Sequence, residues 1–346
     1  MSAQIELGLD TFGDVMADAD GGALSHAESI RNIVEQAVLA DELGVDFIGI
    51  GEHHRSDFAV SAPEVVLAGI ATRTSRIKLG SAVTVLSSDD PVRVFERFST
   101  VDALSNGRAE VIIGRGSFTE SFPLFGFDMG DYQQLFEEKI ELFSELIKND
   151  AVTWSGTMRS SLAEQHVYPK LESGTLKTWV GVGGSPESVV RAAHYGLPLM
   201  LAIIGGDPLR FAPYADLYKR ALAQFEREEL PIGAHSPGHV AASDEQAAEE
   251  LFPHFKANRD NIGRERGWPP MTRAEYEQEI AQGALFVGSP ETVAHKIVRT
   301  VRGLGLSRFD LKYANGTMPH AQLMSSIGLY GREVVPRVRE LLAAEA

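Results

Sequence analysis

The stretch that decides the fold runs from Ile77 to Gly116 and reads IKLGSAVTVLSSDDPVRVFERFSTVDALSNGRAEVIIGRG. It opens with an apolar run of strand type, Ile77–Leu86, and closes with another, Arg108–Gly114. Between them Pro91–Leu104 has the spacing of an amphipathic helix, which the Asn106-Gly107 turn signal ends. A strand, a helix and a second strand in this order predict a βα unit of a parallel sheet.

The same alternation continues in both directions and gives eight βα units. Helical patterns with readable ends separate the strands, for example Glu28–Leu43 followed by Gly44. Eight strands and eight helices predict an α/β protein with a closed (β/α)8 barrel, a TIM barrel; a doubly wound open sheet is the alternative, because strand number does not establish closure. The candidate strands are Ile5–Phe12, Phe47–His53, Ile77–Leu86, Arg108–Gly114, Thr178–Gly183, Leu199–Ile204, Gly238–Ala242 and Arg308–Tyr313.

The length of 346 residues, with 44% of them hydrophobic, suits one barrel domain over residues 1–346. Two stretches are longer than an ordinary connection between elements. We expect residues 151–177 to form a short hairpin and residues 264–284 to form a mobile cover. No linker or internal repeat divides the chain.

The net charge of −16 makes nucleic acid and anionic membranes poor partners, because both repel an acidic surface. No apolar run approaches the length of about 18 residues that a spanning helix needs. The segment Met1–Asp20 carries acids and no Lys or Arg, unlike a signal peptide, so we expect a cytoplasmic protein. Cysteine is absent, which excludes disulfides, thiolate metal sites and a cysteine nucleophile.

Polar residues follow several predicted strands at their carboxyl ends, where an α/β barrel builds its active site. The second strand ends in Glu52-His53-His54-Arg55. Because adjacent strand residues point to opposite sides, only one histidine is expected to face the barrel axis, and we expect no metal. Catalysis of proton transfer and simple capping of the strand end by hydrogen bonds are both compatible with these residues.

The fourth and fifth strands predict an anion site. Arg115 lies between two glycines and suits a phosphate, although a salt bridge to a carboxylate is the alternative. Gly183-Gly184-Ser185-Pro186 reads as the start of a helix whose free amides favour a phosphate. Similar letters recur at Gly288-Ser289-Pro290, so a merely capped helix is also possible. No G-x-G-x-x-G or Gly-Lys-Ser/Thr loop is present, which counts against Rossmann-type NAD and ATP sites.

These residues also carry a resemblance to a known family, the bacterial luciferases and luciferase-like flavin monooxygenases. The matching segments are collinear over more than about 60 residues and then continue nearly to the end of the chain. They are Glu52-His53-His54, Gly80–Leu86, Asp90–Arg93, Leu104–Arg108, Gly114–Gly116, Phe125-Gly126, Tyr195–Pro198, Val287–Glu291 and Ala314–Thr317.

The resemblance implies a barrel that holds FMN at its carboxyl-terminal face, with the flavin ring over the third strand. It implies a cis peptide bond between Ala82 and Val83 next to that ring. Arg115 matches the family's arginine at the flavin phosphate, and the turn with Gly184, Ser185 and Ser188 matches its second phosphate contact. His53 matches the histidine that the family uses as an acid and base beside the flavin, which leaves His54 a structural role.

The function implied by the resemblance is a monooxygenase that takes reduced FMN and oxygen, forms a C4a-peroxyflavin and oxidises a small organic substrate. The eight units use nearly the whole chain, so a separate NAD(P)H:flavin reductase is the expected source of reduced flavin. We expect a homodimer. Luciferase has a reactive cysteine where this chain has Gly114, and an acidic residue where it has Gly184, so light emission is not implied.

Three alternatives keep parts of this interpretation. The first is a hydride-transferring oxidoreductase that binds the deazaflavin F420, and the second is a relative that binds FMN without catalysis. The third is a hydrolase or aldolase that uses His53 with nearby carboxylates. The apolar walls of the site are expected among four aromatic residues, each of which also suits plain core packing. They are Phe12, Phe58, Phe118 and Trp179.

Overall fold

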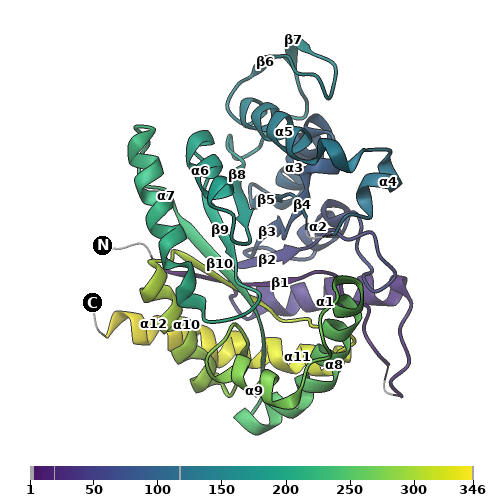
Figure 1. Cartoon of the computed structure of the whole chain (residues 1–346), viewed down its shortest axis with the longest axis vertical. Coiled ribbons are helices and arrows are strands. Elements are labelled where there is room, and N and C mark those ends of the chain that lie inside the picture. Colours follow the sequence, from purple (N-terminus) through teal and green to yellow (C-terminus); the bar gives the residue numbers. More distant parts are fainter. Residues whose placement is uncertain (1–3, 19, 117, 345–346) are drawn as a thin grey trace.

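The computed structural model describes residues 4–18, 20–116 and 118–344. Its centre is a closed barrel of eight parallel strands, surrounded by helices (Figure 1). The barrel strands are β1 (Glu6–Thr11), β2 (Phe47–Ile50), β3 (Lys78–Ser81), β5 (Ala109–Gly114), β8 (Lys177–Val182), β9 (Leu199–Ala202), β10 (Ile232–Val240) and β12 (Arg308–Lys312). They pair in this order, and β12 pairs with β1. The ring confirms the predicted TIM barrel and excludes the open sheet.

Helices follow the strands and cover the outside of the barrel (Figure 1). They are α1 (His26–Glu42), α2 (Pro63–Ala71), α3 (Pro91–Ser105), α4 (Ser121–Phe125), α5 (Tyr132–Leu146), α6 (Pro186–Tyr195), α7 (Ala212–Gln224), α8 (Asp244–Arg266), α9 (Arg273–Ala281), α10 (Pro290–Leu304), α11 (His320–Leu329) and α12 (Val335–Ala343). Short helical turns occupy η1 (Leu86–Ser88), η2 (Met129–Asp131), η3 (Pro208–Phe211) and η4 (Tyr330–Val334). No helix in the described part of the chain is long and apolar enough to cross a bilayer.

The predicted unit around Pro91–Leu104 forms as its sequence dictates. The carboxylate of Asp90 accepts hydrogen bonds from the first amides of α3, and Pro91 takes the first helical position. Asn106 ends the helix in the left-handed conformation. The strand predicted over Ile77–Leu86 is split into β3 and β4 (Thr84–Val85), and β4 pairs with β5.

The seventh predicted strand, Gly238–Ala242, has the wrong bounds, because β10 begins at Ile232. Its pairing with β12 runs from Gly233 to Pro237, upstream of the predicted segment. This part of the strand reads GAHSP, so small and polar residues replace the apolar run by which strands are recognised. After this section β10 continues and pairs with β11 (Phe286–Gly288).

The two long insertions differ in structure. The first contains the predicted hairpin, in which β6 (Ala151–Trp154) pairs with β7 (Leu162–His166) at the top of Figure 1. The second holds the end of α8, a loop and α9, whose buried Tyr276 packs against Phe252 and Phe255 of α8. The expectation that this segment is mobile stays a prediction.

Charged and aromatic side chains fill the amino-terminal half of the barrel interior. The fully buried Arg308 lies between the rings of Phe47 and Trp179, with its guanidinium carbon 4.4 and 4.7 Å from the ring centres. It also forms ion pairs with Glu6 and Glu110. This packing closes one end of the barrel and leaves the other end to the site.

Candidate active site

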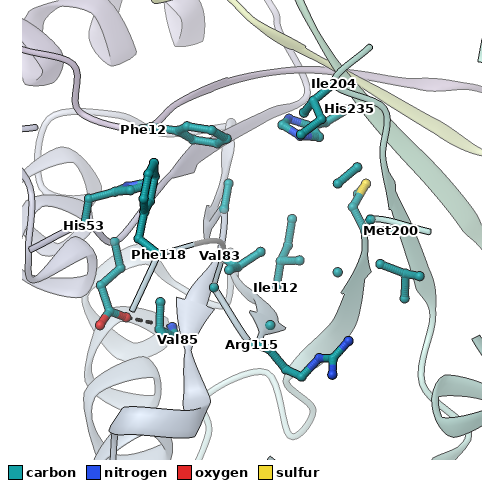
Figure 2. A pocket seen from close by; sticks show the side chains of 18 of the residues that line it. Phe12, His53, Val83, Val85, Ile112, Arg115, Phe118, Met200, Ile204 and His235 are labelled. Carbon is teal, nitrogen blue, oxygen red and sulfur yellow. Dashed lines mark hydrogen bonds between the residues drawn. The ribbon is translucent and has the colours of Figure 1, made fainter. Parts of the chain in front are cut away.

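A cavity of about 470 Å³ lies at the carboxyl-terminal ends of the barrel strands (Figure 2). Its volume falls in the range that proteins use for small ligands and cofactors. Every residue that the sequence analysis assigned to catalysis or cofactor binding lines it, although these residues come from four different segments. They are His53, Ala82, Val83, Arg115, Gly183, Gly184, Ser185 and Ser188.

Arg115 follows β5 directly and marks one end of the cavity (Figure 2). Its guanidinium donates to Gln133 Oε1 at 3.2 Å and to Ser188 Oγ at 3.4 Å. Among the described residues it forms no ion pair with a carboxylate, so the predicted alternative of a salt bridge is not what the structure shows. Its positive charge is available to an anion.

The amino terminus of α6 faces the same end of the cavity. Ser185 caps the helix and accepts a hydrogen bond from the amide of Ser188 at 3.3 Å. Arg191, one turn further along α6, donates from Nη1 to Ser188 Oγ at 3.1 Å, and its guanidinium also pairs with Glu137. Sequence reasoning missed Arg191, although its place three residues after Ser188 on one helix was a readable signal.

Between β3 and β4 the peptide bond Ala82–Val83 is cis, as the resemblance implied. The side chain of Val83 lies against Gly114 of β5 and Gly181 of β8. A Cβ atom added to Gly114 would be 2.8 Å from Val83 Cγ2, so a glycine is needed there for Val83 to pack. Ala82, Val83 and the glycines together form a smooth, apolar wall of the cavity.

His53 is surrounded by aromatic rings. Its imidazole stacks on Phe58 with 4.2 Å between ring centres and also contacts Phe12 and Phe118, at 5.1 and 5.4 Å. Its Nδ1 atom is buried without a hydrogen-bond partner. Burial, with a smaller contribution from the positive charge of Lys312, lowers the pKa of His53 to about 3. The ring is therefore neutral at physiological pH.

His54 also lines the cavity, against the expectation that only one histidine faces inward. The expectation fails because β2 ends at Ile50, so strand alternation no longer applies to the two histidines. His54 Nε2 lies 3.0 Å from Glu52 Oε1, and Glu52 Oε2 accepts a hydrogen bond from the amide of Val85 at 2.8 Å. Glu52 thus ties the segment with the histidines to β4.

The four aromatic residues expected at the walls divide between two regions. Phe12 and Phe118 line the cavity, and Phe58 supports His53 from behind. Trp179 does not line it. Its indole donates to Glu110 at 2.9 Å in the closed half of the barrel, because its position on β8 points it below the site.

The sequence model of the family described as luciferase-like monooxygenase matches residues 11–308. The chain belongs to this family. It is accordingly a flavin-dependent oxidoreductase, as the resemblance predicted. The alkanal monooxygenase alpha chain of Photorhabdus luminescens is 25% identical over 369 aligned residues, which cover 95% of this chain and 97% of that protein.

Two solved structures share the fold of this luciferase-like family member. One is the oxygenating constituent of 3,6-diketocamphane monooxygenase from Pseudomonas putida in complex with FMN, at 18% identity and a TM-score of 0.78, covering 96% of this chain and 98% of that one. The other is an F420-dependent secondary alcohol dehydrogenase, at 16% identity and a TM-score of 0.76, covering 97% and 99%.

Three polar residues that lie inside strands of the luciferase-like barrel, and that the sequence analysis did not single out, also line the cavity. They are Asp10 of β1, His235 of β10 and Asp310 of β12. Each lies inside a strand, whereas the sequence analysis searched the strand ends. The available signal was an ionisable residue at an inward-facing strand position, a costly placement that calls for a partner. The described residues contain no group of three His, Asp or Glu side chains suited to a metal ion.

Proposed function

We propose that this protein is an FMN-dependent monooxygenase that uses reduced FMN and molecular oxygen to oxidise a small organic substrate. The observation that carries the proposal is the position of Arg115. This cation has no carboxylate partner among the described residues and lies beside Ser188 at the amino terminus of α6. The amino terminus of a helix, two serine hydroxyl groups and a guanidinium are the kinds of group that bind a phosphate monoester, and the Ser185 hydroxyl would exchange its present bond to Glu187 Oε2, at 2.7 Å, for the phosphate.

The cavity residues fit FMN at both ends of that molecule. Arg115, Ser185 and Ser188 would hold the phosphate. Gly183 and Gly184 would let the phosphate oxygens approach the backbone, because neither has a side chain and the space next to Gly183 is open, with no atom within 4 Å of a Cβ placed there. The apolar wall at Ala82–Val83 would lie against the flavin ring. The imidazole of His53, which lines the cavity, would lie at the edge of that ring.

Bound reduced FMN would supply the electrons that activate oxygen. The protein's own contribution begins with excluding water, for which Phe12, Phe118 and Val83 provide apolar surface around the reacting region. His53 would move a proton at the reacting edge through its neutral ring. Because its pKa is about 3, the ring is neutral before the reaction and would donate or accept a proton from that neutral form.

Removal of the Arg115 charge tests the phosphate site directly. In Arg115→Met we expect FMN to bind at least about tenfold more weakly, because a charge-assisted hydrogen bond contributes about 1.5–3 kcal/mol. Riboflavin, which lacks the phosphate, should bind wild type and variant alike. Arg93→Met, an exposed arginine of α3, is the matched control. Equal loss for FMN and riboflavin would refute the phosphate assignment.

The cofactor and the reaction need separate measurements. Anaerobic titration with reduced FMN and with F420 identifies the cofactor, and tighter binding of F420 together with hydride transfer would replace the proposal. With FMN bound, labelled oxygen should enter the product of a turned-over substrate. An FMN complex that only ever releases hydrogen peroxide would instead be a non-catalytic relative.

The proposal also includes a separate NAD(P)H:flavin reductase and a homodimer. The chain carries none of the glycine-rich dinucleotide motifs, so it should oxidise NADH negligibly with FMN and oxygen until a reductase is added. Rapid NADH oxidation by the purified protein would exclude the two-component arrangement. The molar mass in solution tests the homodimer.

A further inference from the structure

Besides His53 and His54, the cavity contains a third histidine, His235, whose surroundings are opposite to those of His53. His235 Nδ1 lies 3.0 Å from Asp10 Oδ2, and only 1% of Asp10 is exposed. The two residues are 225 positions apart in sequence, but β1 and β10 both pair with β12, which brings their inward-facing side chains together. A buried carboxylate and an imidazole therefore form a pair inside the barrel.

Figure 2 shows His53 and His235 on opposite sides of Phe12, with Arg115 across the cavity from His235. The ring centre of Phe12 is 5.1 Å from that of His53 and 5.7 Å from that of His235. His235 pairs with Ala202 of β9, and Ala202, Met200 and Ile204 all line the cavity, so this side of it has apolar walls. Arg115 is the only Arg or Lys among the described residues lining this cavity.

The pairing fixes what each ring nitrogen of His235 can do. A carboxylate can only accept a hydrogen bond, so this pairing assigns the proton of the neutral imidazole to Nδ1 and the lone pair to Nε2. Nε2 has no hydrogen-bond partner among the described residues, and His235 lines the cavity. A carboxylate at Nδ1 stabilises the imidazolium that forms when Nε2 takes up a proton. His53 lacks such a partner.

We propose that His235, oriented by Asp10, is the base that takes a proton from the substrate, and that the substrate presents a weakly acidic hydroxyl group, that of a phenol or enol. The O–H bond breaks and its electron pair stays on the substrate oxygen, while an N–H bond forms at Nε2. The resulting phenolate or enolate is electron-rich, as a substrate for oxygen transfer must be. This use of the pair rests on the proposed monooxygenase function.

Charge in the cavity favours such a substrate over a carboxylate or sulfonate. Asp10 lies 3.0 Å from His235, and Asp310 is the partner of His235 in the pairing of β10 with β12. Arg115, the one cationic residue among the described residues of the cavity wall, lies across the cavity from His235. Burial raises the pKa of the Asp310 carboxyl well above its ordinary range, which favours the neutral form of this group over the carboxylate. An aliphatic alcohol is too weakly acidic for an imidazole to ionise it before the reaction begins.

The test uses 4-nitrophenol, whose phenolate absorbs visible light and whose neutral form does not. The probe is titrated with the full-length protein, without flavin or oxygen, at a pH where the free probe is mostly neutral. We expect wild type to convert bound probe to phenolate. His235→Gln should show at least a tenfold smaller phenolate fraction, and Asp10→Asn should fall between the two.

The control is His239→Gln. His239 lies on the same strand and pairs with a carboxylate, Glu250 at 2.8 Å, but it does not line the cavity, so ionisation of the probe should be unchanged. Circular dichroism checks the fold of each variant, and His235→Asn replaces the glutamine variant if the latter does not fold. Nitrogen NMR of the wild type supplies a measurement independent of any variant, with His235 expected to carry its proton on Nδ1.

Three results would overturn the proposal: no phenolate on binding to wild type, an undiminished phenolate signal in the folded His235 variant, or a proton on Nε2 of His235 in the free protein. The experiment distinguishes failure of this proposal from failure of the proposed monooxygenase function. Failure to bind FMN would remove the monooxygenase but would leave ionisation of the probe intact. Conversely, normal FMN binding with no ionisation would remove only the role of His235.

Discussion

At the scale of single residues, Gly114 is the position where one methyl group is expected to disturb the site. A Cβ there would be 2.8 Å from Val83 Cγ2, so Gly114→Ala must push the valine side chain towards the cavity. Overpacking of this kind costs about 1–3 kcal/mol, and we expect FMN affinity to fall about tenfold. Fluorescence titration with FMN measures it. Gly69→Ala, on α2 with nothing within 4 Å of the added atom, should leave affinity unchanged.

The lowered pKa of His53 predicts how the free energy of unfolding changes in acid. Its pKa is about 3 in the folded protein and about 6.5 in an unfolded chain, so the unfolded state binds one more proton between these values. The stability that His53 contributes is therefore present above about pH 6.5 and is lost as the pH falls towards 3. In His53→Gln the free energy of unfolding should decline less steeply over that range, by up to about 1.4 kcal/mol per pH unit. Urea unfolding at several pH values tests this, and identical slopes would contradict it.

At the scale of elements, Arg55 joins three segments over the site. Its guanidinium pairs with Glu120 at 2.5 Å, next to α4, and with Glu265 at 2.6 Å, at the end of α8. Arg55→Met removes both pairs and leaves the partly buried Glu120 without its cation. We expect amide hydrogen exchange to become at least about tenfold faster in Ser121–Phe125 and near residue 265. Arg273→Met, which breaks the exposed pairs of Arg273 with Glu249 of α8 and Glu277 of α9, should not change exchange in these segments.

The strands of the barrel show which parts of the fold and of the site the sequence alone could predict. Apolar runs such as Leu199–Ile204 predicted their strands, and strand ends such as Gly114-Arg115-Gly116 predicted residues that line the cavity, because both signals are local. The sequence did not predict the barrel segment of β10, because its residues are small and polar. This segment is held in place by backbone pairing with strands that are distant in the sequence. The sequence also did not predict the Asp10–His235 pair, because only the closed barrel brings β1 and β10 together.

At the scale of the whole molecule, Arg308 ties the closed end of the barrel together. From β12 it reaches Glu6 of β1 and Glu110 of β5, and it packs between rings from β2 and β8. Arg308→Met would leave the buried Glu110 with only Lys78 and Lys177, each 3.8 Å from its Oε1 atom, and loss of one partner of a buried ion pair costs about 3–5 kcal/mol. We expect urea unfolding at pH 7 to show a loss of this size.

The loss of stability in Arg308→Met is also expected to depend on pH. Despite burial, Arg308 and the neighbouring lysines lower the pKa of Glu6 to about 2 and also lower that of Glu110. Stability from these carboxylates is therefore present above about pH 4.5 and disappears as the pH falls towards 2. The gap between wild type and Arg308→Met should narrow over that range, since protonated carboxyls need no cation. Adding Glu110→Gln to Arg308→Met should recover part of the loss at pH 7. A gap that stays constant with pH would mean that Arg308 acts through packing against Phe47 and Trp179 and not through its charge.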